Sequence, residues 1–227
     1  MDEIKILRPC HAGVARVFFP IGLLEFGGTC QYPSQECLKE CYAMRKDYDE
    51  TVNISEDDKH EIYRYFINKP TVTLCNKIIE EMEGQQAKIL SWFASGDCID
   101  RDIDKLYSVM LLLNELGVVQ NGFTRNRDLY ERILRDEKIK SIVLTVEVLE
   151  SEGDDAFEGY PTGVWAVPDY KKGLVRLYHG KLGYESYGGC GFEGVKHKFK
   201  GKKIEIATNC MGCYKRKIGC FFEPDGV

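Results

Sequence analysis

The chain has 227 residues, of which 44% are hydrophobic, and its formal net charge is −5. This length and composition predict a globular protein with one sizeable domain. The sequence has no run of eighteen apolar residues, and its acidic N-terminus lacks the basic and apolar regions of a secretory signal. We therefore expect a cytoplasmic protein without membrane contact, in which the ten cysteines include metal ligands rather than disulfides.

Charge is distributed unevenly along the chain. Residues 171–217 contain twelve Lys or Arg and three Glu, a net charge of +9, so the remainder carries −14. A basic segment of this kind can attract phosphates, which predicts a nucleic acid or another anionic partner at the C-terminal segment. The alternative is a solvated face that balances the acidic body.

The first predicted elements surround a cysteine-containing loop. Residues 14–19 form a short apolar run that is typical of a strand. Residues 55–68 predict a helix that Ser55 can cap, and residues 71–83 predict a second helix. Cys75 shares the apolar face of this second helix, so we expect a buried core thiol there.

The middle third of the chain alternates between strand and helix patterns. We expect strands over residues 88–94, 118–123 and 141–148, and helices over residues 102–116 and 127–136. Such a series predicts a parallel sheet that is buried on both faces. The expected class is α/β, either a partial or small (β/α) barrel or an open doubly wound sheet.

This interpretation divides the chain into two parts. Residues 1–150 form the α/β domain with its N-terminal cysteine loop, and residues 151–227 form a basic, cysteine-rich, metal-binding segment packed on it. In both candidate architectures, the binding site lies beyond the C-terminal ends of the strands.

Polar residues follow the three predicted strands at those ends. They are Ser95, Gly96, Asp97 and Cys98 after the first strand, Arg125 and Asn126 after the second, and Glu147 late in the third. We expect Asp97 and Arg125 to contact a ligand, because loops at this edge hold the binding site in such folds. Asn126 can instead cap the helix that follows it. Cys98 is a candidate for redox or radical chemistry, and the alternative is that its thiol packs in the core.

Four cysteines near the C-terminus form a specific metal-binding pattern. Cys210 and Cys213 make a CxxC, Cys220 follows, and Cys190 lies upstream in a glycine-rich turn. Four thiolates can hold tetrahedral zinc or an iron–sulfur cluster, so the spacing leaves the metal open. Residues 189–194 also match GxGxxG, but no apolar strand precedes them and no amphipathic helix follows, so we reject a dinucleotide site there.

The loop after the first strand contains Cys30, Cys37 and Cys41 in the spacing C-x6-C-x3-C. Three protein thiolates on a four-iron cluster leave one iron open to a small molecule, whereas a structural site normally closes its coordination sphere. The alternatives are a structural site completed by Cys10 or His11, and three unrelated buried thiols.

Three clustered cysteines after a first strand, with Tyr42 directly after the last, followed by α/β repeats, resemble the radical S-adenosylmethionine (SAM) superfamily over residues 1–150. In the usual CxxxCxxC motif, the last cysteine would stand at Met44, so Cys30 takes its place from the other side. The Ser95-Gly96-Asp97 turn and the C-terminal cysteines also resemble a family of small cysteine-rich proteins of phages and mobile elements.

The radical SAM resemblance implies an oxygen-sensitive 4Fe-4S cluster on the three loop cysteines, with SAM bound to its open iron. It implies an enzyme that receives an electron from a reductant protein and cleaves SAM to methionine and a 5′-deoxyadenosyl radical, which abstracts hydrogen from an unidentified substrate. The C-terminal cysteines resemble an auxiliary cluster, with zinc as the alternative. The residues expected to bind the cofactor are Ser95, Gly96, Asp97, Asn126 and Glu147, and the candidate catalytic residues are Cys98 and Arg125.

Two other functions fit the same residues. One is a non-catalytic nucleic-acid-binding module that zinc or clusters hold together. The other is an iron–sulfur enzyme that binds its substrate at an open iron without SAM.

Overall fold

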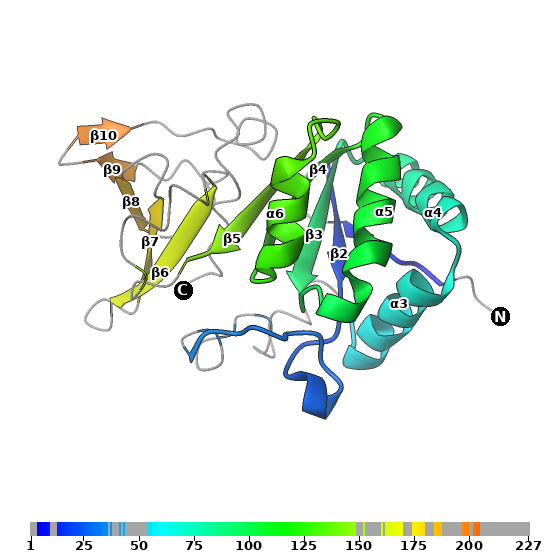
Figure 1. Cartoon of the computed structure of the whole chain (residues 1–227), viewed down its shortest axis with the longest axis horizontal. Coiled ribbons are helices and arrows are strands. Elements are labelled where there is room, and N and C mark those ends of the chain that lie inside the picture. The colour runs from blue at the N-terminus through cyan, green and yellow to red at the C-terminus, as the bar shows by residue number, and fades with distance from the viewer. Residues whose placement is uncertain are drawn as a thin grey trace.

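The computed structural model describes residues 4–9, 13–35, 37, 41, 43, 54–148, 152, 160, 162–169, 174–179, 184–187, 197–199 and 202–204 (Figure 1). Within this part of the chain, eight strands form one sheet and two more form a separate hairpin. The strands of the sheet are β1 (Arg8–Pro9), β2 (Val14–Phe18), β3 (Ile89–Ser95), β4 (Val119–Thr124), β5 (Ile142–Glu147), β6 (Gly163–Asp169), β7 (Leu174–His179) and β8 (Tyr184–Tyr187). The hairpin pairs β9 (His197–Phe199) with β10 (Lys202–Ile204).

The strands follow one another across the sheet in the order of the sequence. Neighbours from β2 to β6 are parallel, whereas β1, β7 and β8 pair antiparallel with their neighbours. The α/β class predicted from the sequence is thus confirmed. The described order never reverses, so it lacks the switch point of a doubly wound sheet.

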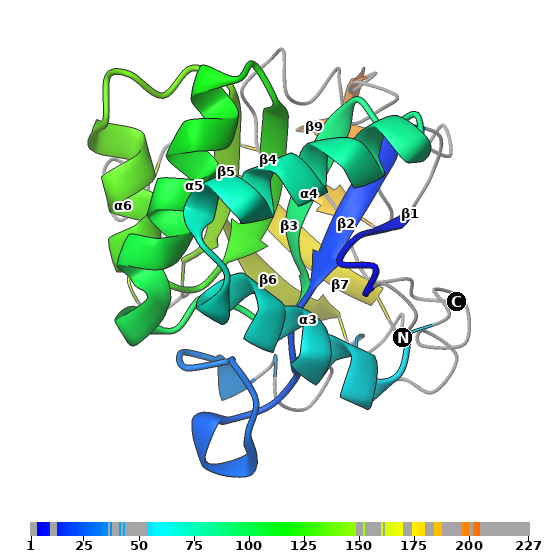
Figure 2. The same cartoon turned by 90° about the vertical axis from the view of Figure 1, so that its right-hand side faces the viewer.

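Among the described residues, four helices connect the strands from β2 to β5 and lie together on one face of the sheet (Figures 1 and 2). They are α3 (Glu56–Asn68), α4 (Thr71–Gly84), α5 (Ile103–Glu115) and α6 (Arg127–Arg135), with short 3₁₀ turns η1 (Leu24–Phe26) and η3 (Asp100–Asp102). Each of the four α-helices begins and ends within two residues of its predicted bounds. At the start of α3, Asp58 N donates to Ser55 Oγ at 3.1 Å and Ser55 N donates to the Asp58 carboxylate at 2.9 Å. This capping box explains why the helix begins there.

The core lies between the helices and the sheet. The Phe66 ring stands edge-on to Trp92 at 5.8 Å and to Phe19 at 5.2 Å between ring centroids. Trp92 is buried, and its indole N–H donates to Gln120 Oε1 at 2.9 Å. Cys75 is fully buried in the same cluster, which confirms the predicted core thiol.

Strands β6, β7 and β8 extend the parallel sheet beyond β5. Strands β6 to β8 therefore join the sheet of the first domain, whereas β9 and β10 form the separate hairpin. The sequence analysis identified no strands in this stretch. Cys190, Cys210, Cys213 and Cys220, and the GxGxxG match at 189–194, lie outside the described residues. None of the described helices is long and apolar enough to cross a membrane.

Candidate functional site at the carboxyl edge of the sheet

The cysteine loop follows β2, and its described residues, 20–35, 37, 41 and 43, lie beyond the arrowheads of β2 and β3 (Figure 1). Its start is fixed to the end of β3, because Phe19 N donates to Ser95 O at 2.9 Å and Ser95 Oγ donates to Phe19 O at 2.8 Å. Thr29 N then donates a hydrogen bond to Pro20 O at 3.0 Å, which closes the first part of the loop. The Ser95 hydroxyl thus holds the cysteine loop against the sheet. Contact of this residue with a cofactor stays a prediction.

Gly96 allows the loop to approach this closely. Its φ is +66°, and a Cβ built there would lie 2.4 Å from Thr29 Oγ1 and 2.8 Å from Pro20 O. Side chains other than glycine rarely adopt this backbone conformation, and the contact with a backbone oxygen leaves no room for one. The requirement for glycine comes from the docking of the loop.

Asp97 ties the end of β3 to the end of β4. Its buried carboxylate accepts hydrogen bonds from Thr124 Oγ1 at 2.6 Å, Cys98 N at 2.7 Å and Arg125 N at 2.7 Å. Burial raises the pKa of Asp97, although these three donors oppose the shift. Since both oxygens accept from the protein, the described role of Asp97 is to position the two strand ends.

Asn126 and Asp100 form a second link between the same loops. Asn126 Oδ1 accepts from Leu129 N at 3.0 Å, which confirms that it caps α6. Its Nδ2 donates to Cys98 O and to Asp100 Oδ1, both at 3.0 Å. Cys98 itself is buried, and burial raises the pKa of its thiol. The structure therefore places this candidate redox residue in the packing beneath the edge.

The three loop thiols lie in one neighbourhood. Cys30, Cys37 and Cys41 are all half-buried. A hydrogen bond with Cys41 and burial raise the pKa of Cys37, and burial raises the pKa of Cys30 to about 11 against an opposing contact from the Gly22 backbone. Cys41 acts electrostatically on both other thiols, and the Arg125 guanidinium lowers the pKa of Cys30 and of Cys37.

Among the described residues, no three His, Cys, Asp or Glu side chains are placed to hold one ion. Ligands of a single ion converge on one point, whereas cluster ligands bind different irons and are spread more widely. The Arg125 guanidinium acts electrostatically on two of the three thiols, Cys30 and Cys37. Cys10 and His11, the alternative fourth ligands, lie outside the described residues.

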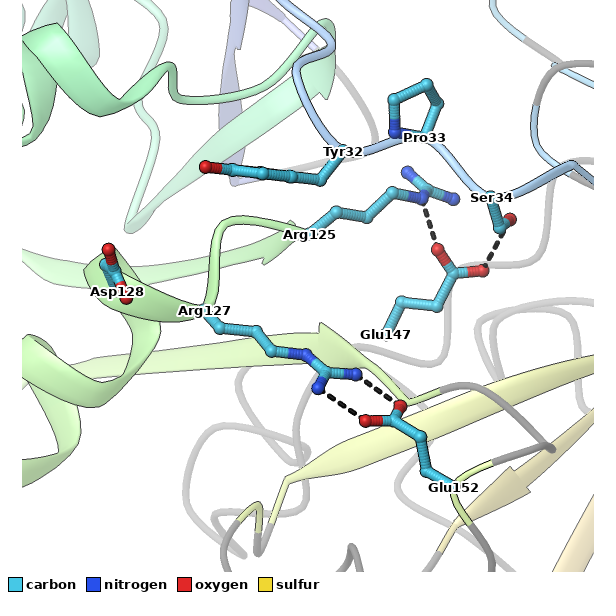
Figure 3. Close-up of a pocket in the computed structure, with 8 residues that line it drawn as sticks. All are labelled: Tyr32, Pro33, Ser34, Arg125, Arg127, Asp128, Glu147 and Glu152. Carbon is cyan, nitrogen blue, oxygen red and sulfur yellow. Dashed lines mark hydrogen bonds and ion pairs between the residues drawn. The ribbon is translucent and has the colours of Figure 1, made fainter.

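A cavity of about 570 Å³ opens at the same edge of the sheet (Figure 3). Its lining residues are Tyr32, Pro33, Ser34, Arg125, Arg127, Asp128, Glu147 and Glu152. Arg125 Nε forms an ion pair with Glu147, and Ser34 Oγ donates to the other Glu147 oxygen at 3.0 Å. Ser34 Oγ also accepts from Cys37 N at 3.1 Å. The cavity is thus linked to a thiol-bearing residue through two hydrogen bonds.

A second ion pair lies across the cavity. Arg127 pairs with Glu152, and its guanidinium stacks over the Tyr160 ring at 5.0 Å. Arg125 stacks in the same way over Phe123 at 5.1 Å. The ionisable side chains of the lining, Arg125, Arg127, Asp128, Glu147 and Glu152, sum to one negative charge at neutral pH.

The structure brings together most of the residues expected from the sequence. Arg125 and Glu147 line the cavity, and Cys41 lies near enough to act electrostatically on Cys30 and Cys37. Ser95, Gly96, Asp97, Cys98 and Asn126 form the scaffold of the neighbouring strand ends. Sequence reasoning missed Tyr32, Arg127, Asp128 and Glu152. The positions of Tyr32, two residues after Cys30, and of Arg127 and Asp128, directly after the Arg125 loop, were the available signals.

Fold and site together define an α/β protein with a polar cavity at the carboxyl edge of its parallel strands, beside the turn that carries Cys37. Comparison with protein-family models, with curated proteins and with solved structures finds no match.

Proposed function

We propose that this protein is a radical SAM-type iron–sulfur enzyme built on a partial (β/α) barrel. The observation that carries the proposal is that Cys41 acts electrostatically on both Cys30 and Cys37, and that Cys37 N donates to Ser34 in the wall of a polar cavity at the sheet edge. A 4Fe-4S cluster on these thiols would supply the electron that cleaves SAM to methionine and a 5′-deoxyadenosyl radical. The sequential order of parallel strands, with helices on one face, is consistent with such a barrel.

The charge of the cavity suits SAM. SAM carries a sulfonium, an ammonium and a carboxylate, which gives it one net positive charge against one net negative charge in the lining. Arg125 Nε forms its ion pair with Glu147, and the two terminal nitrogens of Arg125 have no hydrogen bond among the described residues (Figure 3). A guanidinium whose two terminal nitrogens are not hydrogen-bonded can bind a carboxylate in a bidentate manner. We assign Arg125 to the carboxylate of the ligand.

Glu147 keeps this guanidinium in place. Its carboxylate is held between Arg125 and Ser34, and Ser34 fixes the turn that carries Cys37. The thiol site and the ligand site are therefore oriented by one shared network. Such a network pre-organises both sites before a ligand binds.

The remaining parts of the proposal concern the C-terminal segment. There, Cys190, Cys210, Cys213 and Cys220 would hold a second cluster or zinc, and the basic residues would contact an anionic partner. A reductant protein would deliver the electron. The substrate that the enzyme modifies is left open.

The test is reductive cleavage of SAM by the full-length chain, reconstituted anaerobically with iron and sulfide. With dithionite as reductant, we expect slow release of methionine and 5′-deoxyadenosine without any substrate, followed by chromatography. Cys37→Ala should abolish release, whereas Cys75→Ala, which removes a buried core thiol, should retain it. Wild-type protein that carries its cluster but neither binds nor cleaves SAM would contradict the proposal.

A further inference from the structure

Tyr32 presents an aromatic face to the cavity. Its side chain is 47% exposed although it lines the cavity wall. The hydroxyl donates to the Asp100 carboxylate, and Gln31 Nε2 donates to the same carboxylate at 2.8 Å. Gln31 Oε1 in turn accepts from Asp100 N at 2.8 Å. This clamp fixes the ring, so the ring can receive a ligand without losing conformational freedom.

Asp128 is the second side chain of the cavity, after Tyr32, to which the proposed function gives no role. It lies in the first turn of α6, and its charge acts on the Tyr32 hydroxyl. Among the described residues, its carboxylate takes part in no hydrogen bond or ion pair, whereas the other two carboxylates of the lining, Glu147 and Glu152, are paired with arginines. The cavity thus offers a fixed ring and a free carboxylate near each other (Figure 3).

We propose that Tyr32 and Asp128 form a nucleoside subsite. A planar base stacks on the Tyr32 ring, and the ribose hydroxyls donate to the Asp128 carboxylate. Aromatic side chains are general stacking partners for bases, and an acidic side chain is the usual acceptor for ribose hydroxyls. The inference rests on the proposed function, in which the ligand is SAM and Arg125 takes its carboxylate at the other end of the cavity.

The first experiment measures binding of SAM and of adenosine to the full-length reconstituted protein by calorimetry. Tyr32→Leu should weaken both ligands on the order of ten- to a hundred-fold, because it removes the stacking face. Tyr32→Phe keeps the face and loses only the hydroxyl clamp, so its loss should be smaller. Tyr107→Phe is the matched control, since the Tyr107 hydroxyl also donates to an aspartate, Asp136, but on the helix face.

The second experiment tests the carboxylate. Wild-type protein should bind adenosine on the order of ten-fold more tightly than 2′-deoxyadenosine, since a hydrogen bond to a charged group is lost in the second ligand. Asp128→Asn should reduce this preference. Asp57→Asn should not change it, although Asp57 occupies the same second position of helix α3.

The outcomes separate this inference from the proposed function. If SAM binds equally well to wild type and to Tyr32→Leu, the subsite is wrong and the proposed function stands. If adenosine binding depends on Tyr32 while SAM does not bind, the subsite stands and the SAM assignment falls. If neither ligand binds the cluster-loaded wild type, both are overturned.

Discussion

The helix face and the carboxyl edge of the sheet are held together by different forces. Under the helices, Phe66 and Trp92 pack in a cluster of fully buried apolar side chains. At the edge, the cysteine loop is held by hydrogen bonds with the backbone N–H of Asp97 and with the carboxylates of Asp100 and Glu147. The first region stabilises the fold, and the second sets the position of the thiols. Substitutions should therefore separate stability from metal loading.

The largest loss of stability is expected at the centre of the core. Trp92→Ala removes a buried ring and leaves the Gln120 amide oxygen without its donor. Substitutions of this kind cost about 3–5 kcal/mol in free energy of unfolding. Chemical denaturation followed by circular dichroism measures the effect, and Trp92→Phe, which keeps a ring, should lose less. A cost below about 1 kcal/mol would show that the core does not carry the stability.

Substitution of Gly96 is expected to cost less stability than Trp92→Ala but to reduce iron uptake more. In Gly96→Ala the new methyl group meets Thr29 and the Pro20 carbonyl at a positive φ, so the cysteine loop must move. We expect a cost on the order of 2–4 kcal/mol and strongly reduced iron uptake.

Gly117→Ala provides the control for this change. Its φ is +80°, but a Cβ there would contact nothing within 4 Å. It should cost about 1 kcal/mol through backbone strain alone and leave iron uptake unchanged. Equal iron uptake by both variants would contradict the role of Gly96 in docking the loop.

The smallest effect is expected at the capping box of α3. Ser55→Ala should cost about 1 kcal/mol at neutral pH without changing iron uptake. Hydrogen bonding to the Ser55 backbone lowers the pKa of Asp58, so this carboxylate stabilises the fold above its unfolded pKa of about 3.9. The contribution is lost as the pH falls through the lower, folded pKa. Thermal melts between pH 7 and pH 3 should show the difference between wild type and Asp58→Asn shrinking with acidity.

The sequence predicted the fold of the parallel strands well because those elements have clear local patterns. Ser55 and Asn126 act as helix caps as expected, and the strand ends bring Arg125 and Glu147 to one edge. Strands β6 to β8 were missed because a mixed-polarity segment such as Leu174–His179 depends on its pairing partners rather than on local periodicity.

The site was harder to predict than the fold. The sequence shows that Asp97 follows a strand, but only the distances to Thr124 and Arg125 N reveal that its oxygens accept from the protein. The same limit applies to Tyr32 and Asp128, which are far apart in the chain and share a cavity only after folding. The topology of the sheet predicts which residues lie together at the strand ends, whereas contacts between loops are seen only in the folded structure.

The most direct test of the account is the iron and sulfide content of the full-length protein after anaerobic reconstitution. Wild type should carry about four more iron and four more sulfide ions per chain than the triple variant Cys30→Ala, Cys37→Ala, Cys41→Ala. Cys75→Ala should match wild type. Equal iron in wild type and the triple variant, or stoichiometric zinc without sulfide, would contradict a cluster on the three loop cysteines.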